Sequence, residues 1–253
     1  MTDPGIDQFR EANAGLSSLV TNELASFFDA LNLNKPEASR NALLEFIPLL
    51  VDQYGAVAES LALDRYDELR ADSGAQRSFR ATSPGPGIPA EAVESKVRYL
   101  AGKLWTPEPE SLLGSLSTSV DKYVKQPGRS VFPFNARREG ARWARVPSGK
   151  QTCAFCLVMA SRDAVYHSQG SAGDKAHGDE FHGDCDCQIV RLSQDQEYPK
   201  GYLPADLYDV YEIGADKAGT RSDINAIVYD LRRRFPDRFT DGVADDEYLE
   251  RVG

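Results

Sequence analysis

Residues 43–69 read LLEFIPLLVDQYGAVAESLALDRYDEL. Apolar side chains recur in this stretch at intervals of three and four residues, at Leu43, Leu44, Ile47, Leu50, Val51, Tyr54, Val57, Leu61 and Leu69. This spacing places them on one face of an α-helix. Pro48 lies inside the pattern and has no N–H donor, which predicts a kink or a break near Phe46–Ile47. The stretch therefore predicts long amphipathic helices around an apolar core.

Working outward, the same periodicity predicts further helices on both sides of this stretch. An apolar stripe runs from Ile6 to Leu31, and Asn34-Lys35-Pro36 offers an N-cap candidate followed by a first-turn proline. The run Ser83–Pro89 is rich in Pro and Gly and predicts a loop. Two shorter helical patterns follow it, Ala90–Trp105 and Pro109–Lys125, and the second is expected to end at Gln126-Pro127-Gly128.

The C-terminal part carries fewer apolar residues, but they also follow a helical pattern. Leu207, Val210 and Tyr211 predict one helix. Ser222 can cap another helix, whose apolar face would hold Ile224, Ile227, Val228, Leu231 and Phe235. Tyrosines are frequent in this acidic tail. Two interpretations remain open: peripheral helices packed on their own domain, or segments that order only against a partner.

Charge is distributed unevenly along the 253 residues, whose formal net charge is −10. Residues 1–128 carry −6, residues 129–192 carry +2 and residues 193–253 carry −6. An acidic chain argues against a protein that coats nucleic acid with its whole surface. The longest apolar runs, Phe46–Val51 and Ala154–Ala160, predict no membrane span, and the acidic N-terminus predicts no secretory signal. We expect a soluble, intracellular product.

All four cysteines and all three histidines lie in the central block. Cys153-x2-Cys156 is followed by His182-x2-Cys185-x-Cys187. Two such pairs complete a tetrahedral zinc shell, because a two-residue gap lets both side chains of a turn face one ion. A closed structural site would take Cys153, Cys156 and Cys185 with either His182 or Cys187. Two disulfides joining the halves, a dithiol pair or inert buried cysteines are the alternatives.

A basic stretch lies just upstream of the cysteines. On a helix, Arg138, Arg142 and Arg145 would share one face at i, i+4 and i+7. Such a strip can contact phosphates or carboxylates, either in a local DNA contact or in docking to an acidic partner. The alternative is a solvated face that balances nearby acids.

Signatures of catalysis are weak in this chain. In zinc deaminases the histidine motif precedes the Cys-x2-Cys pair, and here the order of the two motifs is reversed. No nucleophile elbow, Walker A loop or dinucleotide-binding glycine motif is present. We therefore expect no enzyme and no small-molecule substrate. The alternative is a metal-dependent hydrolase or nuclease that uses His177, Glu180 and His182 around the ion.

The motifs around the cysteines resemble the Mu F-like minor head proteins of tailed phages, most closely those of actinophages and actinobacterial prophages. The resemblance rests on Arg145-Val-Pro-Ser-Gly149, on Thr152–Arg162 with Tyr166, and on His182–Cys187. Leu43–Arg70 resembles the helical N-terminal part of the same proteins. The resemblance covers roughly residues 40–192, and it implies a structural role for the Cys/His cluster. Some relatives are fused to capsid maturation proteases, but no serine–histidine arrangement supports that activity here.

Together these observations predict a mainly α fold in three parts. Residues 1–130 would form a helical region, residues 131–192 a small metal-stapled α+β subdomain, and residues 193–253 a helical, acidic, aromatic tail. The resemblance implies a minor capsid protein that acts in head assembly and in DNA packaging or ejection. Its expected partners are the portal, other capsid or scaffold proteins and, locally, packaged DNA. Its expected location is the virion interior or portal vertex, and the host cytoplasm during assembly.

Overall fold

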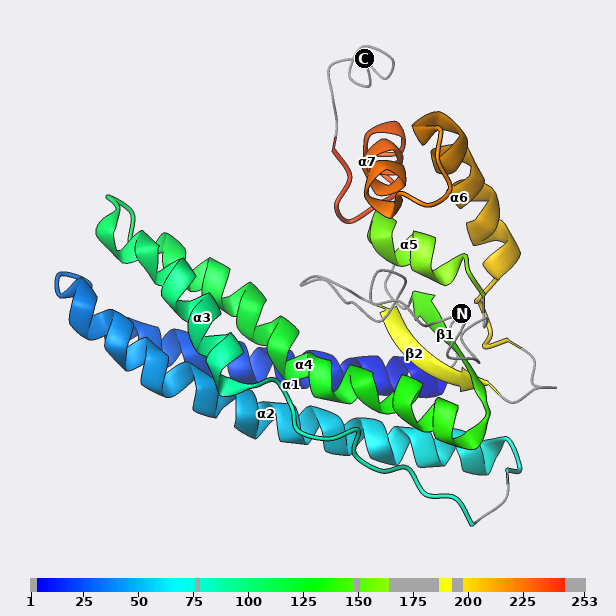
Figure 1. The fold of residues 1–253 in the computed structure, drawn as a ribbon, viewed down its shortest axis with the longest axis horizontal. Coiled ribbons are helices and arrows are strands. Elements are labelled where there is room, and N and C mark those ends of the chain that lie inside the picture. The colour runs from blue at the N-terminus through cyan, green and yellow to red at the C-terminus, as the bar shows by residue number, and fades with distance from the viewer. Residues whose placement is uncertain (1–3, 76–77, 148–150, 164–186, 193–197, 244–253) are drawn as a thin grey trace. The chain divides into compact units, whose positions relative to one another are not determined.

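Helix α2, which spans Pro36–Asp72, contains the opening stretch and is the longest element of the computed structural model (Figure 1). The structure describes residues 4–75, 78–147, 151–163, 187–192 and 198–243. They divide into two compact units. Among the described residues, the helical unit holds those from 9 to 135, and the mixed unit holds residues 4–8 and those from 136 onward. The division therefore falls between Asn135 and Ala136, and the segment after residue 192 shares a unit with the strands.

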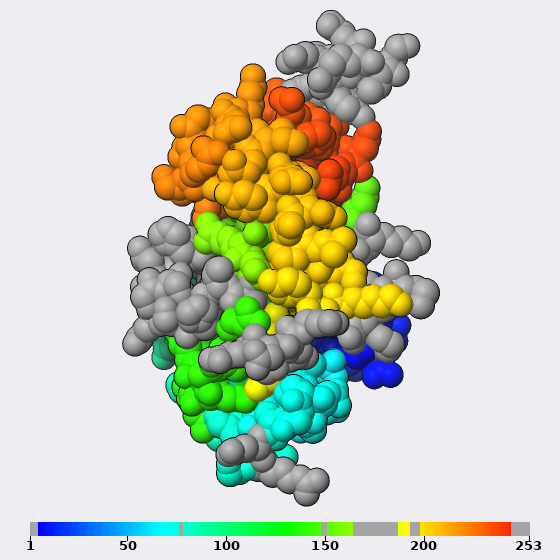
Figure 2. Space-filling model, turned by 90° about the vertical axis from the view of Figure 1, so that its right-hand side faces the viewer, coloured from blue at the N-terminus to red at the C-terminus, as the bar shows by residue number. Residues whose placement is uncertain are grey.

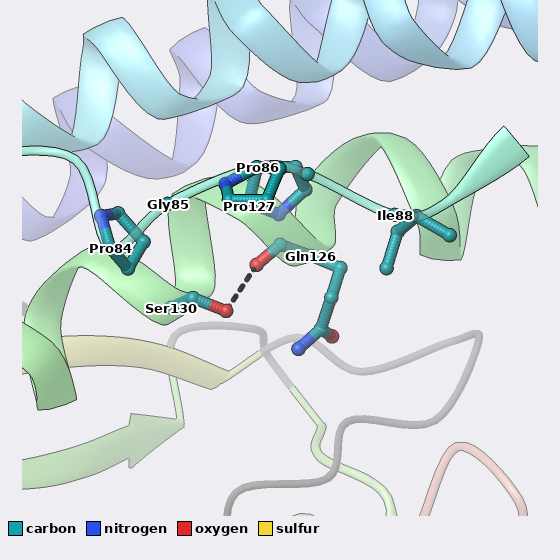
Figure 3. Close-up of a pocket in the computed structure, with 8 residues that line it drawn as sticks. Pro84, Gly85, Pro86, Ile88, Gln126, Pro127 and Ser130 are labelled. Carbon is teal, nitrogen blue, oxygen red and sulfur yellow. Dashed lines mark hydrogen bonds between the residues drawn. The ribbon is translucent and has the colours of Figure 1, made fainter.

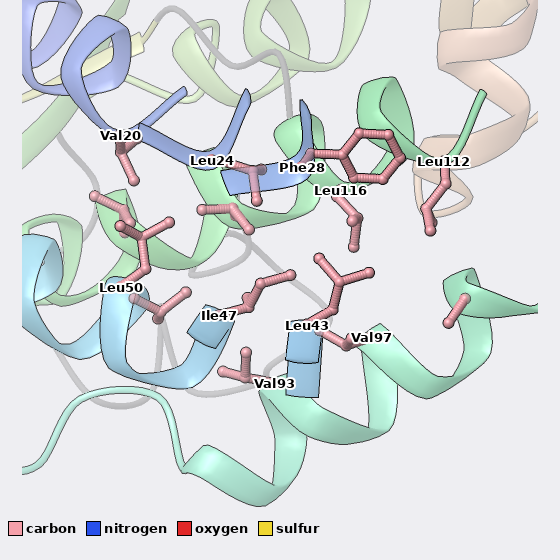
Figure 4. Close-up of a cluster of buried hydrophobic side chains, with 14 of the residues drawn as sticks. Val20, Leu24, Phe28, Leu43, Ile47, Leu50, Val93, Val97, Leu112 and Leu116 are labelled. Atoms are coloured by element: carbon pink, nitrogen blue, oxygen red, sulfur yellow. The ribbon is translucent and has the colours of Figure 1, made fainter. Parts of the chain in front are cut away.

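The core of the helical unit is built from the predicted stripes. Its helices are α1 (Pro4–Asp29), α2, α3 (Ala90–Leu100), the 3-10 turn η1 (Ala101–Trp105) and α4 (Ser111–Glu139). Figure 4 shows their buried side chains converging on one cluster, which includes Val20, Leu24, Phe28, Leu43, Ile47, Leu50, Val93, Val97, Leu112 and Leu116. Each fully buried aliphatic or aromatic side chain contributes about 1.5–3 kcal/mol to folding. The predicted helix over Ala90–Trp105 is confirmed, with its last turn tightened to 3-10.

Helix α2 runs through Pro48 without a break, so of the predicted kink or break near Phe46–Ile47 the break is absent and the kink stays a prediction. Burial on both sides of the proline, at Ile47 and Leu50, offsets the lost hydrogen bond. Pro36 occupies the first turn as predicted, but Lys35 rather than Asn34 is the N-cap residue.

By length and composition alone, α2 is also the one helix in the described ranges that is long and apolar enough to cross a membrane. The sequence predicted no such segment, because its uninterrupted apolar runs are short. The buried residues of α2 pack against α1, α3 and α4 in the core cluster. That packing accounts for the buried apolar side chains of α2, whereas Leu49 and Val57 are exposed.

Helix α4 corrects a second prediction. It does not end at Gln126-Pro127-Gly128 but continues to Glu139, with both Pro127 and Pro133 inside it. Burial of Val131 and Phe132 extends the apolar face beyond the first proline and outweighs its cost of about 3 kcal/mol. The helix ends at Gly140, whose φ of 74° lies in the left-handed region. The N–H of Ala141 then bonds to the carbonyl of Ala136, which closes the last turn.

Gly128 has a packing role instead of a helix-stopping role. A Cβ at this position would lie 2.6 Å from the carbonyl oxygen of Ala58 in α2. One turn away in α2, a Cβ on Gly55 would lie 3.4 Å from Cγ of Pro127. The missing side chains at Gly55 and Gly128 therefore let α2 and α4 approach closely.

We predict that Gly128→Ala destabilises the protein by about 1–3 kcal/mol, because the added methyl must push the α2 backbone away. The matched control is Gly114→Ala, an exposed position of the same helix where an added Cβ meets nothing within 4 Å. This control should gain about 0.5–1 kcal/mol from its higher helix propensity. Urea unfolding of both variants measures the difference. Equal effects of the two substitutions would contradict the close approach of α2 and α4.

The connection between α2 and α3 runs back along the bundle (Figure 1). We call its residues 78–89 the strap. Asn135, which is fully buried in α4, accepts a hydrogen bond from Thr82 N at 3.0 Å and donates one to Thr82 O at 2.9 Å. Two further bonds tie the strap to α2: Arg70 donates to Phe79 O at 2.9 Å, and Asp67 accepts from Ala81 N at 3.0 Å. The strap is therefore held by hydrogen bonds along both helices.

The mixed unit joins a two-stranded antiparallel sheet to three helices. Strand β1 (Arg142–Pro147) pairs with β2 (Cys187–Leu192), with Arg142 opposite Leu192 and Pro147 opposite Cys187. Helices α5 (Ala154–Ala160), α6 (Pro204–Ala218) and α7 (Ile224–Arg234) share a second core, in which Leu157, Val210 and Leu231 are buried. Figure 2 shows α6 and α7 lying against each other. The predicted α+β character of this region is confirmed.

The predicted C-terminal helices are both present. The face of α7 buries Ile227, Val228 and Leu231 as expected, but Asp223 rather than Ser222 caps it, accepting a hydrogen bond from Ala226 N at 3.1 Å. Helices α6 and α7 pack on α5 of their own unit. Residues 198–243 therefore match the interpretation of the tail as peripheral helices packed on their own domain. The acidic residues after 243 lie outside the described residues.

Candidate cysteine centre

Three of the four cysteines come together in the mixed unit. Cys153 is the N-cap residue of α5, and its Sγ accepts a hydrogen bond from Cys156 N at 3.1 Å. Cys187 is the first residue of β2, and its thiol lies 4.0 Å from the Cys156 carbonyl oxygen. All three side chains are buried, and no disulfide joins any two of them. The fold thus brings the second cysteine segment to the first, across 31 residues of sequence.

The remaining predicted ligands, His182 and Cys185, lie outside the described residues, as do His177 and Glu180 of the hydrolase alternative. In the part of the chain that is described, no group of three His, Cys, Asp or Glu side chains is placed to hold a metal ion. Two disulfides joining the halves would pair Cys187 with Cys153 or Cys156, and no disulfide joins these described residues.

Residues 235–243, which we call the clasp, cover the Cys153–Cys156 turn. The clasp forms a parallel bridge between Phe239 and Thr152, and Thr240 N donates to Thr152 O at 3.1 Å. Gln151 adds a side-chain hydrogen bond to the carbonyl oxygen of Asp237 at 2.6 Å. A segment more than 80 residues away in sequence therefore encloses the turn that holds the first two thiols.

Asp241 is the central residue of the clasp. One carboxylate oxygen accepts from Ala154 N, the first N–H of α5, at 2.9 Å. The other accepts from Nε of Arg232 at 2.7 Å, which ties the end of α7 to the same carboxylate. Sequence reasoning missed Asp241 because its partners are distant in sequence and an Asp-Gly pair suggests only a turn.

We predict that Asp241→Ala loosens the clasp, because it leaves the first N–H of α5 and the Arg232 guanidinium without this carboxylate. Loss of a capping carboxylate costs about 1–2 kcal/mol, so Cys153 should react with iodoacetamide at least about fivefold faster. Mass spectrometry of the Cys153 peptide after timed alkylation measures the rate. Asp209→Ala, an exposed position of α6, is the matched control. Equal rates in the two variants would contradict the clasp.

The predicted arginine strip does not form. Arg138 is exposed in the last turn of α4, Arg142 is half-buried at the start of β1, and Arg145 is fully buried within β1. The helix ends before Arg142, and residues three apart on a strand point to opposite faces, so the helical spacing does not apply. The Arg145 guanidinium carbon lies 5.8 Å from the centre of the Phe155 ring. This cation–π contact is made inside the mixed unit rather than with a partner.

A buried ion pair supports the sheet next to this centre. Arg191 of β2 is 3% exposed, and its Nε donates to a Glu139 carboxylate oxygen at 2.9 Å while a terminal nitrogen contacts the other oxygen. The pair fixes the end of α4 to the strand. Removing one partner of a buried pair leaves the other charge uncompensated, which is costly.

We predict that Glu139→Gln lowers the free energy of unfolding by about 3–5 kcal/mol. The control, Glu94→Gln, breaks an exposed pair with Arg98 and should cost at most about 0.5 kcal/mol. Urea denaturation at neutral pH compares them. A loss in Glu139→Gln as small as in the control would show that the pair contributes nothing.

Surface charges of α6 are partly neutralised by one arginine. Arg221 donates to Glu212 at 2.6 Å and to Asp216 at 3.1 Å. Hydrogen bonding to Arg221 lowers the pKa of the Glu212 carboxyl below its ordinary value, so this side chain stays ionised to lower pH. The tail is therefore less acidic at this surface than its composition suggests.

Comparisons with known proteins identify the family. A family model described as VG15 protein matches residues 1–213 of the chain. The Gene 15 protein of Mycobacterium phage D29 is 24% identical over an alignment of 165 positions, which covers 50% of this chain and 60% of that protein. The chain therefore spans less than two thirds of the relative it matches. No solved structure matches the chain. Because the family model covers most of its length, the chain belongs to the VG15 protein family, and its relative points to a phage protein.

Proposed function

We propose that this VG15 family member is a minor structural protein of a tailed-phage head, acting at or near the portal in head assembly and in DNA packaging or ejection. The family match over residues 1–213 and the phage relative carry the phage origin. The resemblance of the Cys/His motif to Mu F-like minor head proteins adds the role in the head. The proposed partners are portal and other capsid or scaffold proteins, with packaged DNA as a local contact, and the proposed location is the virion. The role is structural and requires no turnover.

A structural role fits the burial of the arginine and cysteine side chains in the described part of the mixed unit. Arg145 and Arg191 are buried and support the mixed unit, and the three described cysteines are buried as well. Among the proposed DNA-contacting arginines, Arg138 alone is exposed, so a DNA contact by these arginines would involve that end of α4. We therefore place protein–protein contact ahead of DNA contact in the proposal.

The test is the composition of purified particles from a phage or an induced prophage that encodes this chain. Quantitative mass spectrometry should find the protein at a few copies per particle, and deletion of its gene should yield heads that fail to package or to deliver DNA. Particles that lack the protein, together with normal infectivity after deletion, would refute the proposal.

We also propose that a structural zinc ion staples the mixed unit, held by Cys153, Cys156 and Cys185 with either His182 or Cys187. The support is the paired spacing of these residues and the N–H···S bond within the Cys153–Cys156 turn, which orients the Cys153 sulfur. Cys187 Sγ lies near the same turn. Structural zinc sites are closed by four protein ligands, which leaves no position for a reacting water.

Elemental analysis of tag-free protein tests the zinc proposal, with an expected content of about one zinc per chain. Cys153→Ser should abolish zinc binding, because it removes a ligand common to both sets. Cys187→Ser separates the two sets: retained zinc assigns the fourth position to His182, and lost zinc assigns it to Cys187. Metal-free protein with four titratable thiols and an unchanged melting temperature after chelation would refute a structural metal.

A further inference from the structure

The strap creates two clefts in the helical unit, one on each side of its Pro/Gly-rich part. The larger cleft has a volume of about 290 Å³ and lies between Pro84–Ile88 and the α4 residues Gln126, Pro127 and Ser130 (Figure 3). Ser130 donates to the backbone carbonyl of Gln126, and among the described residues no hydrogen bond engages the Gln126 side-chain amide. Small-molecule pockets begin at about 300 Å³, so this cleft suits a single large side chain.

The wall of the larger cleft is formed by three proline rings, those of Pro84, Pro86 and Pro127. Pro86 and Pro89 are exposed, and Pro89 has φ −57° and ψ 135°, the polyproline II conformation. Pro89 does not line the cleft, but proline rings are recognised by aromatic side chains, so the three proline rings of the wall favour an aromatic partner. The hydrogen bonds to Asn135 and Asp67 hold the strap before any partner binds, which reduces the entropy cost of association.

The smaller cleft lies on the other side of the strap and carries negative charge. Its volume is about 70 Å³, and it shares Gly87, Ile88 and Pro127 with the larger cleft. Its α2 wall consists of Asp52, Gly55 and Glu59 with their neighbours Val51 and Ala56. Gly55, which lies between the two acids in the sequence, lines this cleft next to Pro127.

Asp52 and Glu59 lie seven residues apart, two turns along the same side of α2. Asp52 is exposed and Glu59 is half-buried. Within the described residues, neither carboxylate forms an ion pair or a side-chain hydrogen bond. Two uncompensated carboxylates attract a cationic side chain. The apolar residues Ile88 and Pro127 beside them favour a segment in which an apolar side chain lies next to the cationic one.

We propose that these two clefts bind a segment of a partner protein that carries an aromatic side chain next to a lysine or arginine. The aromatic ring stacks on the prolines of the larger cleft, with a hydrogen bond to the Gln126 amide where the ring has a polar group. The basic side chain enters the smaller cleft between Asp52 and Glu59. The proposal concerns the helical unit alone and does not depend on the proposed role in the phage head.

The test uses the full chain and a panel of acetylated heptapeptides that contain one Trp and one Arg separated by zero to three glycines. Binding is followed by 15N NMR, where the amide signals of Gly55, Gly85 and Gly87 report on both clefts. At least one peptide should shift all three signals with a Kd below about 1 mM. Replacing its Arg by Glu, or its Trp by Ala, should abolish the shifts.

Two double variants of the protein, each of which removes two negative charges from α2, separate the effect of the site from that of net charge. The double variant Asp52→Asn/Glu59→Gln should weaken binding about fivefold or more, because it removes both carboxylates. The double variant Glu45→Gln/Asp64→Asn makes the same charge change at exposed positions of the same helix and should bind like the original. Equal weakening by both double variants would reduce the effect to net charge and overturn the site. Absence of shifts across the panel would overturn it as well, whether or not the chain is found in virions.

Discussion

The close approach of α2 and α4 is the constraint on which the helical unit depends. Gly128 leaves room for the backbone of Ala58, and Gly55 leaves room for the ring of Pro127. With that spacing, α4 keeps its apolar face against the bundle through both of its prolines and ends at Gly140. Without the approach, the missing hydrogen bond at Pro127 would favour a helix end where the sequence suggests one.

The path of the strap follows from the same contact. Because α4 continues past Pro127, it carries Asn135 to Thr82, and the paired hydrogen bonds fix the strap there. The strap then crosses Pro127 and forms a cleft on each side. A helix that ended at residue 126 would provide neither the anchor nor the wall of the larger cleft.

In the mixed unit, long-range contacts determine the cysteine centre. Cys153 and Cys156 occupy one turn because of local spacing, but Cys187 reaches them only through the pairing of β1 with β2. The clasp then covers the turn, and Asp241 links it to α5 and α7 at once. This centre is therefore stabilised by three segments that are far apart in sequence, which suits a rigid component of an assembly.

The sequence alone was sufficient for features set by local periodicity. Spacing within a few turns of chain predicts the apolar stripes of α1, α2, α3 and α7, and the structure has them. Local residues likewise predict the first-turn Pro36 and the loop at residues 83–89. The paired spacing of Cys153 and Cys156 likewise indicated a turn that holds two thiols. Local patterns succeed here because helix formation and turn geometry depend on neighbouring residues.

Tertiary structure decided where α4 ends, where the arginines lie and what covers the cysteines. Pro127 looks like a helix stop in isolation, but burial of Val131 and Phe132 outweighs its local cost. Arg138, Arg142 and Arg145 share a face only if the chain between them is helical, and strand pairing at β1 removed that condition. Asp241 gave no local signal, because its partners Ala154 and Arg232 are brought to it by folding. Contacts between distant segments contribute energies that no local pattern contains, and these contacts selected the final arrangement.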